Sequence, residues 1–170
     1  MSRKRAGSPS APAAKLSHVA PDGSARMVDV SDKPETVRIA RARGTIRMSL
    51  DAFDAIRSHR TPKGDVLSVA RLAGVMAAKK TADLVPLCHP LLLDDVKVEM
   101  TADPDLPGIV AESTVRCTGR TGVEMEAILA VAVALVTVYD MAKSADRAMV
   151  IGDISLVEKT GGRSGTYYNR

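Results

Sequence analysis

The ten residues at positions 127–136 (AILAVAVALV) contain no polar side chain, and this stretch limits most strongly how the chain can fold. It has about half the length of a membrane-spanning helix, which needs roughly 20 apolar residues. We therefore predict a helix from about residue 122 to residue 144 that is buried in a globular protein. The 170 residues suffice for one domain with a sizeable core. With one Phe and no Trp, this core must be built from Ala, Val, Leu, Ile and Met.

Apolar and polar residues alternate elsewhere in the chain, as is typical of strands that are buried on one face. We predict such strands at residues 41–49 (RARGTIRMS), 94–103 (DDVKVEMTAD), 108–119 (GIVAESTVRCTG) and 149–161 (MVIGDISLVEKTG). In the third of these, one face carries Ile109, Ala111, Ser113, Val115 and Cys117. Cys117 is therefore predicted to be a small core residue.

Two further helices are predicted between the first two strands, at residues 49–59 and 66–84, with Asp65 as the N-cap of the second. Pro86 and Pro90 disfavour a regular helix, so residues 84–91 should form a fixed connector. The order is strand, two helices, strand, strand, helix, strand. It predicts an α+β sandwich of the ferredoxin-like type, with helices packed on one face of an antiparallel sheet.

The net charge of +4 comes from one end of the chain. Residues 1–15 carry four basic residues and no acidic residue, which leaves 20 basic and 20 acidic residues in the remainder. We predict a disordered basic tail at 1–15 and a single domain at 16–170. The tail has no apolar core of signal-peptide length, and a transit peptide is left open. A neutral domain with few aromatic residues argues against nucleic acid as the partner.

The two cysteines, Cys88 and Cys117, lie 29 residues apart and form no CxxC motif. This spacing argues against a zinc ribbon or a disulfide scaffold and fits a reducing cytosol. Cys88 precedes His89 between two prolines, in the stretch 83–95 (DLVPLCHPLLLDD). The adjacent Cys88 and His89 could bind a metal, attack a substrate or form a structural turn. However, no second pair of potential metal ligands lies at a spacing suited to a metal site.

Basic residues at two places suggest anion binding. Lys63 lies just before the predicted N-terminus of the helix 66–84, where the helix dipole and free N–H groups favour a phosphate. The alternative is a solvated lysine in a turn. Lys159 and Arg163 flank glycines in the stretch 158–165 (EKTGGRSG), which could cradle phosphate or be an ordinary basic segment.

Acidic residues lie near both ends of the long predicted helix. Glu124 and Glu126 either complement its positive end or provide a carboxyl group that moves protons. Asp140 and Lys143 share a helix face, as a surface ion pair or as a partly desolvated acid/base pair. In a straight helix, Glu126 and Asp140 would lie roughly 21 Å apart. Either the helix begins later than Glu126, or one site combines these groups from two chains, which we favour.

Several motifs support a family assignment. The stretches 63–91 (KGDVLSVARLAGVMAAKKTADLVPLCHPL), 121–127 (TGVEMEA), 138–143 (VYDMAK) and 149–165 (MVIGDISLVEKTGGRSG) occur in this order. They resemble the MoaC family, the cyclic pyranopterin monophosphate synthases of molybdenum cofactor biosynthesis, and the resemblance covers about residues 16–166. It implies a ferredoxin-like catalytic domain in a cytoplasmic homohexamer, a trimer of dimers with active sites at dimer interfaces.

The resemblance also implies a lyase reaction. Such an enzyme converts 3′,8-cyclo-7,8-dihydro-GTP, the product of a radical S-adenosylmethionine GTP cyclase, to cyclic pyranopterin monophosphate and releases pyrophosphate. It implies no required cofactor and no membrane or nucleic-acid partner, and it leaves open whether Mg²⁺ accompanies the triphosphate.

Site residues follow from the matching motifs. The catalytic residues would be Lys63, His89, Asp140 and Lys143, with no metal ligands. Substrate would be bound by Lys63, Leu87, Cys88, His89, Glu124, Met125, Glu126 and Lys159. The family usually has lysine at the position of Arg163, so Arg163 is given no catalytic role. A nucleotide sensor that does not convert its ligand is the alternative, and turnover would distinguish the two.

Overall fold

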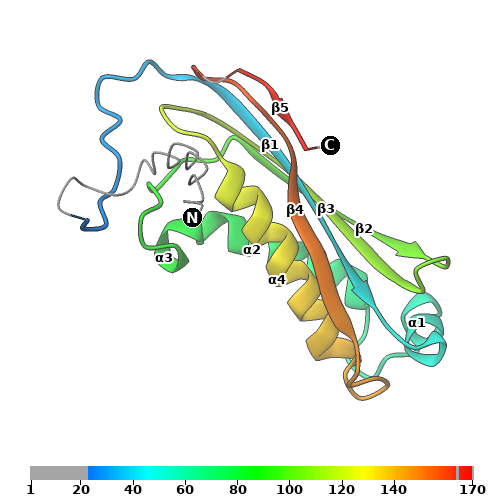
Figure 1. Cartoon of the computed structure of the whole chain (residues 1–170). Helices are drawn as coiled ribbons and strands as arrows, with labels where there is room; N and C mark the ends of the chain where they lie inside the picture. Colours follow the sequence, from blue (N-terminus) through cyan, green and yellow to red (C-terminus); the bar gives the residue numbers. More distant parts are fainter. Residues whose placement is uncertain (1–22, 164, 170) are drawn as a thin grey trace, which may run out of the picture.

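The computed structural model describes residues 23–163 and 165–169, so the predicted basic tail lies outside the described residues. Its sheet is antiparallel and has five strands in the order β2-β3-β1-β4-β5 (Figure 1). The strands are β1 (Thr36–Arg47), β2 (Asp95–Asp103), β3 (Gly108–Gly119), β4 (Val150–Thr160) and β5 (Tyr167–Tyr168). The first four strands have the arrangement of a ferredoxin-like fold, which confirms the predicted α+β architecture.

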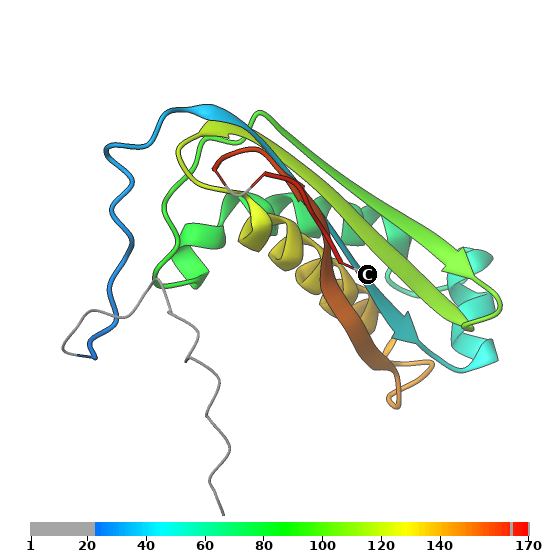
Figure 2. The ribbon, with the colours of Figure 1, turned by 45° about the horizontal axis from the view of Figure 1, so that its top comes forward.

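The helices are α1 (Leu50–Arg57), α2 (Val66–Lys79), α3 (Thr81–Leu84) and α4 (Glu124–Ala142). The two long helices, α2 and α4, lie on one face of the sheet (Figure 2). Asp65 caps α2 as predicted, because its carboxylate accepts a hydrogen bond from the Ser68 N–H. The predicted helix at 66–84 is interrupted at Lys80, so that α3 forms a separate turn.

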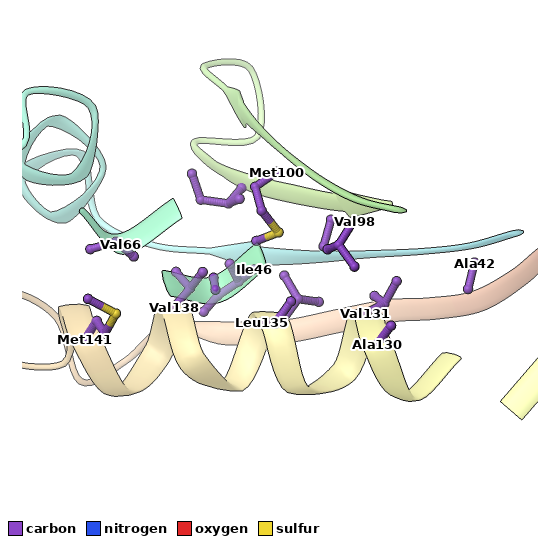
Figure 3. Packing of buried hydrophobic residues seen from close by; sticks show 14 of the residues in the cluster. Ala42, Ile46, Val66, Val98, Met100, Ala130, Val131, Leu135, Val138 and Met141 are labelled. Carbon is purple, nitrogen blue, oxygen red and sulfur yellow. The ribbon is translucent and has the colours of Figure 1, made fainter. Parts of the chain in front are cut away.

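The hydrophobic core lies between α4, α2 and the sheet (Figure 3). Val131, Leu135 and Val138 of α4 are fully buried, and Ile46 and Val98 contribute from the strands. By length and composition α4 could cross a membrane, but half of that apolar window is buried within the fold. The helix therefore has the surroundings of a core helix in a globular protein, as its sequence predicts.

Strand β3 confirms the predicted alternation except near its start, where Val110 of the predicted outward face is also buried. Its five predicted inward residues are at most 2% exposed, and Cys117 is a buried core residue. The prediction was wrong at the start of β1, which begins at Thr36 rather than at residue 41. Residues 36–40 extend as a strand because they pair with the end of β3, from Thr36 opposite Gly119 to Ala40 opposite Val115.

Strand β5 was not predicted at all. Its two tyrosines pair with Glu158 and Lys159 of β4, and both tyrosines are exposed. A strand of two residues is too short to show an alternation of apolar and polar side chains. Its conformation is therefore determined by its neighbour in the sheet.

Candidate functional site

A pocket of about 800 Å³ lies where β1 begins, β4 ends and α4 begins. Four stretches that are distant in sequence line it: residues 28–39, which run into β1, the connector after α3, residues 120–126, which run into α4, and residues 159–163, from the end of β4 into the glycine-rich stretch. Eight of the residues singled out from the sequence lie in its wall: Leu87, Cys88, His89, Glu124, Met125, Glu126, Lys159 and Arg163. The structure therefore brings together all predicted substrate-binding residues except Lys63.

The connector is held to the chain before β1 by His89. Its Nε2–H donates a hydrogen bond of 2.8 Å to the carbonyl oxygen of Val28. Residues 85–91 contain neither helix nor strand, which confirms the predicted connector. Burial raises the pKa of the Cys88 thiol, and the nearby Glu126 and Glu124 add to this effect. A thiol kept protonated is a poor nucleophile, which argues against covalent chemistry at Cys88.

The two glutamates of the first turn of α4 have different surroundings. Glu124 forms an ion pair with Lys159, with 2.8 Å between Oε1 and Nζ. Glu126 is only 4% exposed, and burial, with a further contribution from Glu124, raises its pKa. A buried carboxyl group with a raised pKa in a pocket wall is suited to exchanging a proton. The alternative that Glu126 only complements the positive end of the helix dipole therefore does not explain its burial in the pocket wall.

Arg38 is a pocket residue that sequence reasoning missed. Its guanidinium donates hydrogen bonds of 3.3 Å to the carbonyl oxygens of Gly119 and Arg120. It lies in the part of β1 that was not predicted. A single arginine in a polar stretch gives no indication that it belongs to a functional site. Proximity to the pocket could have been inferred only from the pairing of β1 with β3 and β4.

The glycines after β4 allow the chain to pass close to β1. Gly161 and Gly162 have φ of 93° and 76°, a conformation that favours glycine. A Cβ atom at Gly161 would lie 2.2 Å from the carbonyl oxygen of Val37. After this close approach, Arg163 lies in the pocket wall, as does Lys159.

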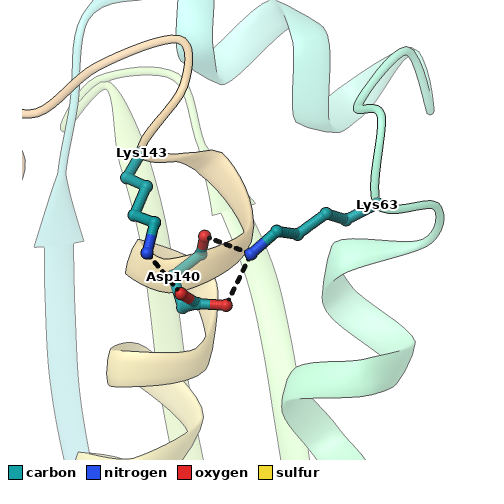
Figure 4. A network of polar contacts seen from close by, with 3 residues as sticks. All are labelled: Lys63, Asp140 and Lys143. Atoms are coloured by element: carbon teal, nitrogen blue, oxygen red, sulfur yellow. Dashed lines mark hydrogen bonds and ion pairs between the residues drawn. The ribbon is translucent and has the colours of Figure 1, made fainter.

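Lys63, Asp140 and Lys143 form a second group at the other end of α4, which we call the Asp140 cluster (Figure 4). The Lys63 ammonium donates to an Asp140 carboxylate oxygen at 2.7 Å and to its carbonyl oxygen at 3.0 Å. Lys143 donates to the other carboxylate oxygen at 2.8 Å. Lys63 thus binds a carboxylate here, and it does not lie near Lys159.

The Asp140 cluster is exposed, contrary to the expected partial desolvation. The Asp140 side chain is 55% exposed, because the apolar run that precedes it faces the core and Asp140 faces outward. Hydrogen bonds from Lys143 and Lys63 lower its pKa to about 2. In this arrangement Asp140 is an ionised carboxylate at neutral pH, held between two ammonium groups.

Helix α4 begins at Glu124, so the alternative in which it begins after Glu126 is excluded. Glu126 and Asp140 lie on one helix, at a separation of roughly 21 Å. The pocket and the Asp140 cluster are therefore separate groups within one chain. In the described part of the chain, no group of three or more His, Cys, Asp and Glu side chains could hold a metal ion.

The fold and the pocket define a class: a ferredoxin-like α+β protein whose pocket combines ammonium and carboxyl groups with a buried acid. The model of a family described as "MoaC family" matches residues 27–162. A cyclic pyranopterin monophosphate synthase of Novosphingobium aromaticivorans is 61% identical over 152 residues, 89% of this chain and 96% of that protein. The chain belongs to the MoaC family.

Cyclic pyranopterin monophosphate synthases of other bacteria are also similar to this chain. The protein of Cereibacter sphaeroides is 55% identical over 152 residues, 89% of this chain and 96% of its own length. That of Nostoc sp. is 55% identical over 155 residues, 91% of this chain and 92% of its own length. Each match spans nearly the whole relative, so the similarity extends well beyond a shared motif.

Proposed function

We propose that this chain is a cyclic pyranopterin monophosphate synthase of molybdenum cofactor biosynthesis. It converts 3′,8-cyclo-7,8-dihydro-GTP to cyclic pyranopterin monophosphate and releases pyrophosphate. This activity is supported by the similarity to proteins named cyclic pyranopterin monophosphate synthase. The observation that carries it is that residues 87–89, 124–126 and 159, which are distant in sequence, line one pocket.

The proposed roles in the pocket follow from charge and burial. Lys159 neutralises phosphate oxygens, since it is a cation in the pocket wall. Glu126 and Glu124 accept hydrogen bonds from the N–H donors of the guanine-derived ring. Leu87, Cys88 and Met125 shape the pocket, and His89 supplies or orients a further proton-transfer group.

Asp140 and Lys143 form the main acid/base pair for ring opening and reclosure, together with Lys63. With a pKa of about 2, Asp140 is a weak base, so the ammonium groups that it holds are the proton donors of this pair. Lys63 and Lys143 then also neutralise developing negative charge and phosphate oxygens. Substrate that enters the cluster would replace one of its lysine contacts.

We also propose that the site is assembled from two chains, in a homohexamer built as a trimer of dimers. Its support is the length of α4, which keeps Glu126 and Asp140 of one chain apart. We place the enzyme in the cytoplasm, functionally linked to the radical S-adenosylmethionine enzyme that supplies its substrate. It would act without a resident cofactor, membrane or nucleic acid, with Mg²⁺ as a candidate companion of the triphosphate.

Mixing the pure protein with the cyclised nucleotide tests the activity. Pyrophosphate and a pterin product should both appear, and a sensor would instead return its ligand unchanged. The Asp140→Ala variant should lose at least 100-fold in turnover (an order-of-magnitude expectation for a proton-transfer group). Normal turnover by a folded, assembled Asp140→Ala protein would contradict the role of Asp140.

A further inference from the structure

Arg38 lies on the face of β1 that otherwise belongs to the core. Side chains at alternate positions of a strand point to the same face, and Ala40 and Ala42, the next two residues on the face of Arg38, are buried. Arg41 and Arg43 point to the other face and are exposed. A guanidinium at the end of an inward row is costly unless it is hydrogen-bonded. The contacts of the half-buried Arg38 therefore indicate why an arginine occupies this position.

Both strands that pair with β1 end beside Arg38. The last residue of β3 is Gly119 and the last residue of β4 is Thr160, and both are paired with residues among the first four of β1. Beyond them the chain continues as residues 120–123, which we call the β3–α4 loop, and as residues 161–163 of the glycine-rich stretch. Both segments line the pocket. Arg38 is thus placed to contact two walls of the pocket at once.

The guanidinium holds the start of the β3–α4 loop by its backbone. Nε donates to the carbonyl oxygen of Gly119 and Nη2 donates to that of Arg120, each at 3.3 Å. A guanidinium is a rigid planar fork of donors, so two such bonds fix the orientation of the peptide groups as well as their distance. The loop leads directly into α4, which begins at Glu124. Arg38 therefore influences where the glutamates of the first turn lie.

The glycine-rich stretch packs against the same side chain. A Cβ atom at Gly162 would lie 1.7 Å from Nη1 of Arg38, and a Cβ atom at Gly161 would lie 3.2 Å from its Cδ. Only a residue without a side chain leaves room for the guanidinium at Gly162. Two nitrogens of Arg38 thus bind the β3–α4 loop, and the third contacts the stretch that follows Lys159.

We propose that Arg38 is a positioning residue of the pocket. It holds the β3–α4 loop and the glycine-rich stretch in a fixed relation, and so aligns Glu126 and Lys159 on one bound nucleotide. This inference rests on the proposed function for the reaction that it serves. The connection itself follows from the contacts of Arg38 with both segments.

The role becomes important when the pocket is occupied. In the ligand-free structure, the ion pair of Glu124 with Lys159 also joins α4 to β4. In the proposed function, Lys159 binds phosphate and Glu124 binds the guanine-derived ring, so this ion pair opens. The contacts of Arg38 are with backbone atoms and do not depend on that ion pair. Arg38 therefore still connects the two segments when substrate is bound.

Hydrogen exchange of the ligand-free protein, followed by mass spectrometry, tests the connection without turnover. In Arg38→Ala, the backbone amides of residues 119–123 and 160–163 should exchange roughly 10-fold faster, because opening these segments no longer breaks contacts with the guanidinium. Arg43→Ala, on the exposed face of the same strand, is the control and should leave both segments unchanged. Unchanged exchange of either segment in Arg38→Ala would overturn the proposal.

Arg38→Lys separates positioning from simple neutralisation of phosphate. Lysine keeps the charge, but its compact ammonium lacks the planar fork that reaches both carbonyl oxygens. Arg38→Lys should therefore lose roughly 100-fold in kcat/KM, the loss that a misplacement of about 1 Å causes. Circular dichroism should show a folded protein, since the side chain is only half-buried. A kcat/KM near that of the wild type would show that the charge alone matters and would contradict the proposal.

A double-mutant cycle with Gly162→Ala tests the contact itself. The added Cβ atom should displace the guanidinium and lower kcat/KM in the wild-type background. In the Arg38→Ala background the same substitution meets no guanidinium, so its effect should be about 10-fold smaller. The backbone cost of φ 76° at this position is present in both backgrounds and cancels. Equal effects in the two backgrounds would show that Arg38 does not act through Gly162.

Turnover by the wild type separates this inference from the proposed function. If the wild type converts the nucleotide and Arg38→Ala exchanges and turns over normally, the positioning role is wrong and the function stands. If both segments exchange faster in Arg38→Ala but the wild type does not convert the nucleotide, the connection stands and the proposed function is wrong.

Discussion

At the scale of single residues, Glu126 has the least usual environment among the described carboxyl groups. Burial makes ionisation unfavourable, so its pKa in the folded protein lies above the ordinary value of 4.5. Folding therefore favours the protonated form. Its contribution to stability is fully present below pH 4.5 and is lost as the pH rises through the folded-state pKa.

We expect Glu126→Gln to remove this pH dependence, because an amide does not ionise. The free energy of unfolding of Glu126→Gln, relative to that of the wild type, should increase from pH 4.5 to pH 8. Urea denaturation followed by circular dichroism suits this measurement, since the chain has no Trp. A difference that stays constant over this range would show that burial does not perturb Glu126.

His59 adopts a backbone conformation that suits glycine better. Its φ is 53°, and its N–H donates to Ile56 O just beyond the end of α1. We expect His59→Gly to stabilise the protein by roughly 0.5–1 kcal/mol, because it removes the cost of a left-handed conformation. His59→Ala keeps that cost and is the control. Thermal melts should rank Gly above both His and Ala, and a lower stability for His59→Gly would contradict this.

At the scale of elements, the packing of α2 on α4 depends on Gly74. An added Cβ atom would meet the backbone of Ala130, which cannot rotate away as a flexible side chain can. Gly74 thus allows the two helices to approach closely, although glycine is a poor helix former.

We expect Gly74→Ala to destabilise the protein by about 1–3 kcal/mol, the usual range for overpacking, despite the better helix propensity of alanine. Gly152→Ala in β4 is the matched control, since an added Cβ atom there has no neighbour within 4 Å. Urea denaturation of both variants provides the comparison. Equal stability of the two variants would show that the helices move apart at little cost.

At the scale of the whole molecule, a site shared by two chains makes a quantitative prediction. Glu126→Gln and Asp140→Ala proteins should each be inactive, because each lacks one half of every site. After subunits exchange, about a quarter of the sites should regain both wild-type groups, since half of the dimers are mixed and each restores one site. Activity of the mixture, with exchange checked by mass tagging, is the measurement. No recovery after confirmed exchange would place all catalytic groups in one chain.

Much of the fold and the composition of the pocket could be predicted from sequence. The apolar run of α4 and the alternation of β3 are local periodicities, and burial of one face follows from them directly. Motif matching identified Leu87, Glu126 and Lys159, because each belongs to a distinctive stretch. Arg38 was missed because its contacts are made across the sheet with residues about 80 positions away.

By itself, the sequence determined the order of the elements from β1 to β4 apart from the separate turn α3, the core helix, the Asp65 cap and the family, because these depend on local pattern or on motifs. Only the tertiary structure decided where β1 begins, that Lys63 contacts Asp140, and that Glu126 is buried while Asp140 is exposed. Two residues on one helix acquire opposite environments because the sheet and α2 cover some sides of α4 and leave others open. Because every residue at positions 127–136 is apolar, the sequence does not show which side of α4 is covered.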